Sequence, residues 1–281
     1  MTFSKIKSYA KINLSLNITG KSSCLHKIES IVAFINLYDD ILVKRTKSKR
    51  HSILFKGKFS KNIGKNNTIL KLLKLLEKKS LLYNKKFEIK IIKRIPNKSG
   101  LGGGSMNAAN LLKYFIKKKI IKVTKNQTLA ICKSVGSDVI LGLNSTNSIL
   151  TSKNDVKRFT NYKKIYTLIV KPNFGCSTKE LYSEVKKYNK PKINRPNKKM
   201  FNLNYLKEMN NSLEYIAFSK YNKLRIIKSY LEKLSRPSFV RMTGSGSALV
   251  AYFQSKERCN SARKQFSKKY KNYWCIAAKT I

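Results

Sequence analysis

Residues Pro96–Asn110 read PNKSGLGGGSMNAAN, a glycine-rich segment that is expected to lie between a strand and a helix. A strand is expected before it, because apolar residues alternate at Phe87, Ile89 and Ile91. A helix is expected after it, where apolar residues follow helical spacing at Ala108, Leu111, Leu112 and Phe115. Backbone N–H groups and the positive end of a helix dipole meet at such a junction, and both favour an anion. The segment therefore predicts a phosphate-binding loop.

The residues within the segment narrow the kind of loop. Glycines at Gly102, Gly103 and Gly104 let the backbone approach phosphate oxygens without a Cβ clash, and Ser105 adds a hydroxyl donor. The lysine of a P-loop is absent, because Ser105 and Met106 follow Gly104. The order of glycines required for dinucleotide binding is absent too. These absences exclude a P-loop NTPase and weaken a dinucleotide site, while a flexible interdomain turn stays as the structural alternative.

A strand is expected near the N-terminus. Residues 11–18 read KINLSLNI, and this strict alternation places the four apolar side chains on one face. Lys11 and Asn13 therefore share the other face.

The rest of the chain predicts a mixed α and β protein. Thr68 is expected to cap a helix whose apolar face is Ile69, Leu72, Leu73 and Leu76. Further expected elements are strands at 28–37 and 40–45 separated by a turn at 39–40, connective residues at 46–67, helices at 126–135 and 178–187, a strand at 166–170, a charged linker at 188–199, helices to about 235, and a strand turn at 239–253. Polar residues at 151–164 predict two domains, 1–153 and 154–281.

The composition indicates a folded globular protein. The chain has 281 residues, of which 42% are hydrophobic, and Pro and Gly are scarce. It has no run of about 18 apolar residues, and Lys5, Lys7 and Lys11 interrupt any signal sequence, so a cytoplasmic location is expected. The five cysteines are scattered, which predicts free buried thiols and no zinc site.

The net charge of +48 raises the question of a nucleic-acid or membrane partner. Lys and Arg are spread over the whole chain, with neither a basic tail nor an aromatic and basic RNA-binding motif. Dispersal argues against a dedicated binding face. Lys, Asn and Ile are abundant and have A/T-rich codons, so we hypothesise that mutational bias inflated the charge.

Three motifs, in order, resemble those of the GHMP kinase superfamily: YAKINLSLNITGK near the N-terminus, the glycine-rich segment, and RMTGSGSALVAYF near the C-terminus. The resemblance implies a two-domain α+β fold, with an N-terminal domain like domain 2 of ribosomal protein S5 and a ferredoxin-like C-terminal domain. It implies a kinase that uses ATP and Mg²⁺ on a small molecule, with both substrates in a cleft between the domains. It leaves monomer and homodimer open, with no membrane partner.

The resemblance also implies roles for individual residues. ATP phosphates would contact Pro96, Lys98, Ser99, Gly100, Leu101, Gly102, Gly103, Gly104, Ser105 and Asn107. Asp138, in a G-S-D-V sequence that matches the family's G-A-D-V, is the candidate general base and also a substrate contact. Lys11 matches the catalytic lysine and would keep Asp138 ionised, and Asn13 would hold the substrate. The alternatives are a surface lysine and a helix-terminal aspartate.

The A-K-x-N-L opening resembles the branch of the family that acts on a cytidine diphosphate compound. His26 matches the residue that faces cytosine, and Thr178 and Tyr182 match positions at the nucleobase. A lone structural histidine and a core tyrosine are the alternatives. Leu25 stands where the family has an aromatic residue that stacks on the base, so cytosine binding is expected to be weaker or rearranged.

Other departures concern the two glycine-containing turns. The glycine-rich segment lacks two glycines and one serine of the family pattern, and Lys98 could contact a phosphate instead. Gly244 and Gly246 would let a second turn pack close to this loop, or serve packing alone. Three alternatives to the assigned function stay open: another kinase of this superfamily, a basic nucleic-acid-binding protein on a kinase fold, and an enzyme of poor activity.

Overall fold

The structure is a computed structural model that describes residues 2–22, 25–61, 63–64, 66–160 and 163–281. It has two compact units. Unit 1 comprises Met1–Ala10, Leu37–Asn97 and Gly102–Ser145, and unit 2 comprises Lys11–Asn36, Lys98–Leu101 and Thr146–Ile281. Strands β1 (Ser4–Lys21) and β2 (His26–Thr46) pair with each other and contribute to both units. The expected domains 1–153 and 154–281 stay a prediction; the compact units differ from them by grouping residues 11–36 and 98–101 with the C-terminal part.

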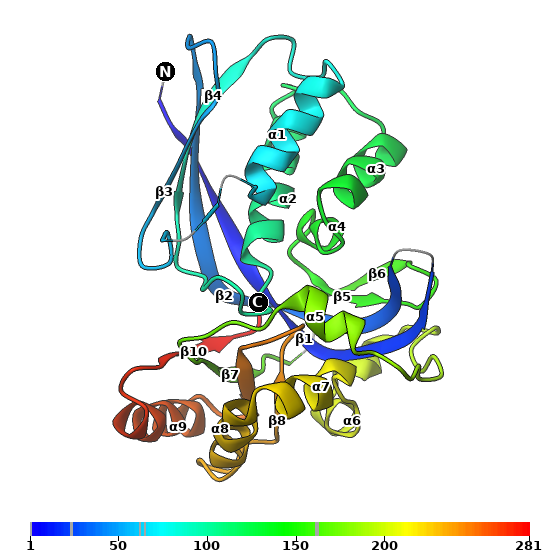
Figure 1. Cartoon of the computed structure of the whole chain (residues 1–281), viewed down its shortest axis with the longest axis vertical. Helices are drawn as coiled ribbons and strands as arrows, with labels where there is room; N and C mark the ends of the chain where they lie inside the picture. Colours follow the sequence, from blue (N-terminus) through cyan, green and yellow to red (C-terminus); the bar gives the residue numbers. More distant parts are fainter. Residues whose placement is uncertain (1, 23–24, 62, 65, 161–162) are drawn as a thin grey trace. The chain divides into compact units, whose positions relative to one another are not determined.

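Unit 1 contains strands on which helices pack. Its further elements are β3 (Ser52–Lys56), α1 (Thr68–Lys78), β4 (Lys86–Ile92), α2 (Gly103–Lys117), α3 (Lys125–Val135) and α4 (Val139–Gly142). Strand β4 pairs antiparallel with β2 and parallel with β3. Figure 1 shows α1 and α2 on one side of β2 and β4. Their apolar faces form one core with the strands, so the alternating and helical patterns of the sequence meet in a single cluster.

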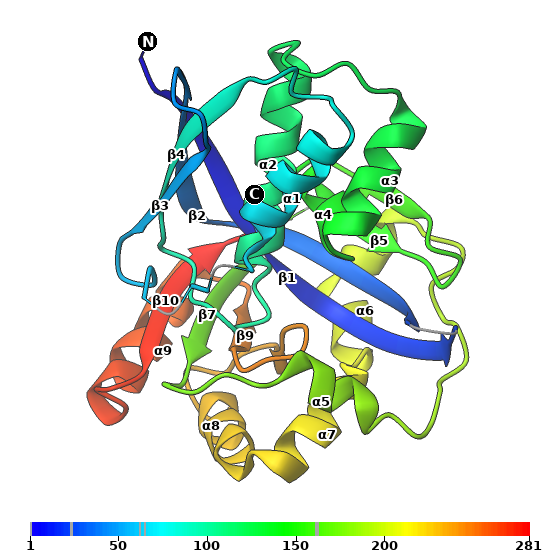
Figure 2. The same cartoon turned by 45° about the horizontal axis from the view of Figure 1, so that its top comes forward.

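Unit 2 contains an antiparallel sheet of four strands in the order β10 (Trp274–Lys279), β7 (Tyr166–Lys171), β9 (Leu249–Phe253) and β8 (Phe239–Met242). Its further elements are β5 (Asn147–Leu150), β6 (Val156–Phe159), α5 (Thr178–Ser183), a 3-10 turn (Lys198–Phe201), α6 (Leu203–Glu208), α7 (Ser212–Lys220), α8 (Asn222–Glu232) and α9 (Lys256–Lys269). Figure 2 shows β10, β7 and β9 side by side. Apolar residues of α7, α8 and α9 pack with β7, β8 and β9 in one core.

Several expected elements are confirmed. The strand over residues 11–18 is part of β1, and Ile69, Leu72, Leu73 and Leu76 are the buried residues of α1. Helix α3 ends at Val135 with Gly136 as its C-cap. Free, buried thiols are confirmed at Cys132, Cys176 and Cys259. Cys275 is free but only partly buried, and Cys24 lies outside the described residues.

Other expectations were wrong in identifiable ways. The expected turn at Asp39–Asp40 lies within β2, and α1 begins at Thr68 with Asn67, not Thr68, as its N-cap. The connective stretches contain β3 and β6, two short strands with partly exposed residues and therefore a weak pattern. The helix from Thr178 ends at Ser183 instead of Lys187. Within the described residues, no helix is long and apolar enough to cross a membrane.

Candidate functional site

The first half of the glycine-rich loop, Lys98–Leu101, is held by backbone contacts within unit 2. Gly100 has φ of 72°, and a Cβ placed on it would lie 1.9 Å from the carbonyl oxygen of Thr243. The N–H of Ser247 donates to the carbonyl of Lys98 at 3.3 Å, and the N–H of Ala248 donates to that of Ser99 at 3.3 Å. Only glycine allows this approach at position 100. The expectation that a second turn packs close to the loop is therefore confirmed.

Strand β1 brings two predicted residues to the same place in unit 2. The N–H of Lys11 donates to the carbonyl of Leu101 at 3.1 Å, and the N–H of Asn13 donates to Thr243 Oγ1 at 2.9 Å. Lys11 Nζ donates to Asn13 Oδ1 at 2.6 Å, which confirms that the two side chains share a face. Both residues are at most 4% exposed. A buried ammonium and a buried amide therefore lie beside the loop, and a surface role for Lys11 is excluded.

The second half of the loop, Gly102–Asn107, belongs to unit 1 and includes the first turn of α2. Gly102 is the N-cap with φ of 70°, no side chain caps this end, and the first turn carries no acidic residue. Gly104 is exposed, and Thr68 Oγ1 donates to its carbonyl at 2.7 Å. Free N–H groups at an uncapped, fifteen-residue helix suit an anion. The residues present therefore fit the phosphates of ATP.

A buried carboxylate in β2 organises the base of that helix. Asp39 Oδ1 accepts from the N–H groups of Arg94 at 2.7 Å and Ile95 at 2.9 Å. Its Oδ2 accepts from Asn107 Nδ2 at 2.9 Å and forms an ion pair with Lys93. The Asp39 side chain is fully buried and that of Lys93 is 3% exposed. Asp39 therefore fixes the chain entering the loop and the helix leaving it.

The sequence analysis did not include Asp39 and Lys93 in the site. Asp39 was assigned to a turn, because paired aspartates are typical of turns. A Cβ placed on Gly103 would lie 3.1 Å from Lys93 Nζ, so the buried ammonium lies under the first turn of α2. Lys93 is thus connected with the loop by this close approach and by its ion pair with Asp39, and no local sequence pattern records either contact.

Asp138 lies in unit 1 in the turn between α3 and α4. It is partly buried, it is the N-cap of α4, and its side chain makes no capping hydrogen bond. A Cβ placed on Gly136 would lie 3.9 Å from Ser105 Oγ, so this turn passes beside the first turn of α2. Unit 1 therefore groups Asp138 with the second half of the loop, whereas Lys11 and Asn13 belong to unit 2.

The predicted nucleobase residues lie in unit 2. The ring of His26 lies 5.1 Å from that of Tyr182 and 6.2 Å from that of Tyr188, centroid to centroid. Burial, and then the ammonium of Lys21, lower the pKa of His26, so its imidazole is neutral at pH 7. Thr178, the first residue of α5, shares a 2.7 Å hydrogen bond with Ser245 of the second turn. The structure thus brings His26 and Tyr182 together and joins Thr178 to the turn at 244–246.

Arg241 and Asn211 are two further buried polar residues of unit 2, and no local sequence pattern marks them. The Arg241 guanidinium donates to the carbonyls of Leu14, Leu206 and Met209 and lies 4.5 Å from the Phe239 ring. Asn211 Nδ2 donates to the carbonyls of Met242 and Gly244, each at 2.8 Å. Asn211 therefore holds the turn through the carbonyl of Gly244, whereas Arg241 joins β8 to β1 and to the end of α6.

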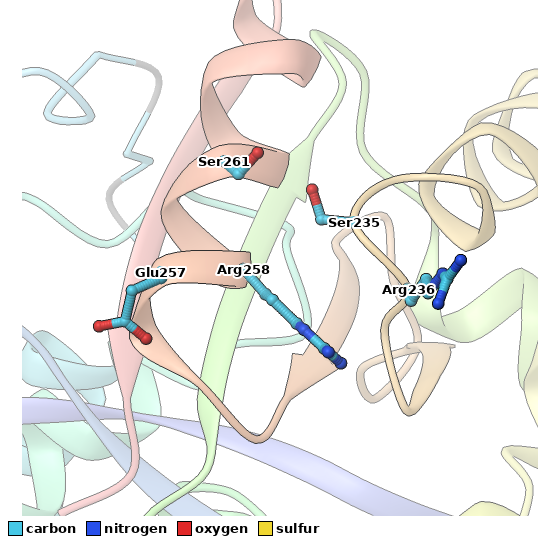
Figure 3. Close-up of a pocket in the computed structure, with 5 residues that line it drawn as sticks. All are labelled: Ser235, Arg236, Glu257, Arg258 and Ser261. Carbon is cyan, nitrogen blue, oxygen red and sulfur yellow. The ribbon is translucent and has the colours of Figure 1, made fainter.

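A surface pocket of about 440 Å³ lies elsewhere in unit 2. It is lined by Ser235, Arg236, Glu257, Arg258 and Ser261, none of which is a predicted site residue. Figure 3 shows Glu257 and Arg258 pointing to different sides of α9. Its charged side chains are exposed, so the pocket has no built polar site.

Comparison with known proteins first defines the class of protein to which the chain belongs. The family model described as GHMP kinases N terminal domain matches residues 67–149. A crystal structure of a 4-(cytidine 5′-diphospho)-2C-methyl-D-erythritol kinase has a TM-score of 0.79 with 22% identity and covers 99% of each chain. A homoserine kinase from Cytophaga hutchinsonii has a TM-score of 0.73 with 15% identity, over 100% of this chain and 95% of that one. The fold is that of the GHMP kinases.

A sequence relative then narrows the family. The 4-diphosphocytidyl-2-C-methyl-D-erythritol kinase of Pelagibacter ubique (strain HTCC1062) is 56% identical over 277 residues, which are 99% of each chain. The present chain belongs to the 4-diphosphocytidyl-2-C-methyl-D-erythritol kinase family of the GHMP kinases. The expected α+β kinase fold and the expected class of enzyme, an ATP-dependent small-molecule kinase, are confirmed.

Proposed function

We propose that this chain transfers the γ-phosphate of ATP to the 2-hydroxyl of 4-(cytidine 5′-diphospho)-2-C-methyl-D-erythritol, a step of the non-mevalonate route to isoprenoid precursors. The observation that carries the proposal is the 56% identity, over 99% of both chains, to a protein that bears the name of this kinase. The grouping of Lys11 and Asn13 with the loop supports it.

The proposed chemistry is an in-line displacement at phosphorus. The 2-hydroxyl oxygen attacks the γ-phosphorus, the bond from that phosphorus to the β,γ-bridging oxygen breaks, and ADP leaves. Asp138 takes the proton of the hydroxyl as general base. Lys11 supplies positive charge near the acceptor oxygen, and Asn13, whose Oδ1 accepts from Lys11 at 2.6 Å, positions that ammonium and contacts the substrate.

The glycine-rich loop is proposed to hold the ATP phosphates. The N–H groups of Gly103, Gly104 and Ser105 lie at an uncapped helix end, where charge-assisted hydrogen bonds to phosphate oxygens are favourable. The aliphatic part of Lys98 packs on Gly175, since a Cβ there would lie 2.6 Å from that of Lys98, and its exposed ammonium is proposed to reach a phosphate. The other residues predicted at this site, Pro96, Ser99, Gly100, Leu101, Gly102 and Asn107, are proposed to shape the backbone of the glycine-rich loop.

Mg²⁺ is proposed as the partner of ATP, because it neutralises phosphate charge during transfer. Among the described residues, no group of three or more His, Cys, Asp or Glu side chains could hold a metal ion. Mg²⁺ is commonly bound by one or two carboxylates together with substrate phosphates, so we propose that the ion arrives with the nucleotide.

The cytosine is proposed to lie against His26, Thr178 and Tyr182. The neutral imidazole offers one hydrogen-bonding nitrogen to the edge of the base, and the tyrosine ring offers a face for stacking. We further propose that the enzyme works in the cytoplasm as a monomer or homodimer, without a nucleic-acid or membrane partner.

Substitution of Asp138 tests the proposed mechanism. Asp138→Asn keeps the size of the side chain but removes the base, so kcat is expected to fall by about 10²- to 10⁴-fold. Asp138→Ala should have the same effect. The measurement is substrate-dependent ADP release, with the unfolding midpoint as control for folding. Near-normal turnover in a folded variant would remove Asp138 from the mechanism.

A different kinase of the same superfamily is the second candidate. The similarity of the fold to homoserine kinase, at a TM-score of 0.73, means that the fold alone does not choose the acceptor alcohol. The acceptor is decided by comparing ADP release with the cytidine diphosphate compound, homoserine and mevalonate.

A further inference from the structure

His26 carries a buried nitrogen that lacks a partner. Its Nε2 is buried and has no hydrogen-bond partner among the described residues. A buried polar atom without a partner destabilises a protein, so such an atom needs an explanation. The rings of Tyr182 and Tyr188 lie beside the imidazole, and neither residue gives Nε2 a hydrogen bond. The atom and the rings together suit a flat heteroaromatic ligand with a polar edge.

Tyr188 is an unusual neighbour, because it is 45% exposed and follows α5 in a stretch without regular structure. The sequence analysis placed it in a charged linker. The structure instead ties the next residue to β1: the N–H of Asn189 donates to the carbonyl of Ile18 at 2.9 Å, and its Nδ2 donates to Asn17 Oδ1 at 2.7 Å. An exposed aromatic ring is thus held on a fixed backbone.

Glu29 fixes the same stretch from β2. Its carboxylate accepts from the N–H of Lys192 at 2.8 Å, the N–H of Ile193 at 3.2 Å and Asn17 Nδ2 at 2.8 Å. The residue is fully buried. A buried carboxylate with three donors, two of them from the backbone, is a specific anchor and not a solvated charge. Glu29 therefore anchors residues 192 and 193 of the stretch that begins with Tyr188 beside His26.

We propose that Tyr188 supplies an aromatic face of the nucleobase subsite, and that Glu29 is a positioning residue that acts through Tyr188. The proposal rests on the proposed function, and it names the determinant of affinity for the pyrimidine. Leu25 is 69% exposed and offers no π-face. The ring of Tyr188 takes that place from a different part of the chain, with the edge of the base on His26 Nε2.

The test is a set of variants in steady-state kinetics with both substrates. Tyr188→Ala should raise KM for the cytidine substrate by about 5- to 100-fold, because stacking of a base on an aromatic ring has that effect. The KM for ATP and kcat should change less than about twofold, because the ring is remote from the transferred phosphate in this proposal. Tyr188→Phe should retain the wild-type KM. Tyr215→Ala, at a tyrosine 82% exposed on α7, is the matched control and should change nothing.

Glu29 is tested by a double-mutant cycle. Glu29→Gln should raise KM for the cytidine substrate with an unchanged KM for ATP, and it should have no further effect in the Tyr188→Ala background. Additive effects would overturn the role through Tyr188, and an unchanged KM in folded Tyr188→Ala would overturn the aromatic face. Failure of the proposed function has a different result: wild-type protein would then not turn over the cytidine substrate at all. Unfolding midpoints identify any variant that fails to fold.

Discussion

The two halves of the glycine-rich loop use their glycines for different purposes. In the first half, Gly100 sits against the Thr243 backbone, where a Cβ would meet an oxygen at 1.9 Å. In the second half, Gly104 is exposed in the first turn of α2, and its nearest neighbour would be Thr68 Oγ1 at 3.1 Å. One glycine is needed by the fold of unit 2, and the other leaves the helix end open to a ligand. Two glycines of one motif therefore meet different structural requirements.

The two halves also differ in what supports them. Backbone hydrogen bonds hold Lys98 and Ser99, whereas the buried ion pair of Asp39 and Lys93 supports the second half. A backbone contact depends on shape, and a buried charge depends on its partner. Three substitutions separate these supports.

The largest effect is expected for Asp39→Ala. It leaves the Lys93 ammonium buried without its partner and removes the acceptor of the Arg94 and Ile95 N–H groups, so the free energy of unfolding should fall by about 3–5 kcal/mol. Urea unfolding measures the change. Asp40→Ala is the matched control, because Asp40 pairs with the half-exposed Arg94, and its effect should be about 1 kcal/mol. Equal effects at the two positions would refute the special role of Asp39.

A smaller loss of stability is expected for Gly100→Ala. The positive φ and the clash with Thr243 should together lower the free energy of unfolding by about 2–4 kcal/mol. Gly64→Ala is the control, because a Cβ there meets nothing within 4 Å. A Gly100→Ala variant as stable as the control would show that the first half of the loop can move away from the turn.

The smallest change in stability is expected for Gly104→Ala. Alanine favours a helix over glycine by about 0.5–1 kcal/mol, which offsets the close approach to Thr68 Oγ1, so the unfolding midpoint should hardly move. The KM for ATP should rise, because a methyl group would stand at the helix end proposed to receive phosphate. Isothermal titration with ATP measures the affinity directly. Unchanged affinity would place the phosphates elsewhere.

Helices and strands that follow from the spacing of nearby residues could be predicted from the sequence. Alternation at residues 11–18 and helical spacing at Ile69–Leu76 fix side chains relative to their own element, and those elements are confirmed. The glycines of the loop and of the turn at 244–246 record close backbone approaches, and these too are confirmed. Asn13 and Lys11 could be assigned to a shared face because two residues along a strand is one repeat.

The distant partners of buried charged side chains could not be predicted. Asp39 has the local appearance of a turn residue, yet its acceptors are satisfied by groups 54 to 68 positions later, which keeps β2 continuous. Residues 188–193 have the composition of a linker, yet Asn189 is bonded to β1, and Lys192 and Ile193 are bonded to Glu29, which lies 163 and 164 positions earlier. A charge pattern shows neither the burial nor the partner of a polar group.

Product formation from the cytidine substrate tests the central claim most directly. Purified protein is given ATP, Mg²⁺ and, in separate reactions, 4-(cytidine 5′-diphospho)-2-C-methyl-D-erythritol, homoserine or mevalonate. ADP release and the mass of the product are then measured. We predict turnover with the cytidine compound and a product heavier by one phosphoryl group, with little or none for the other two alcohols. Preferred phosphorylation of homoserine or mevalonate, or no phosphorylation of the cytidine compound by folded protein, would contradict the account.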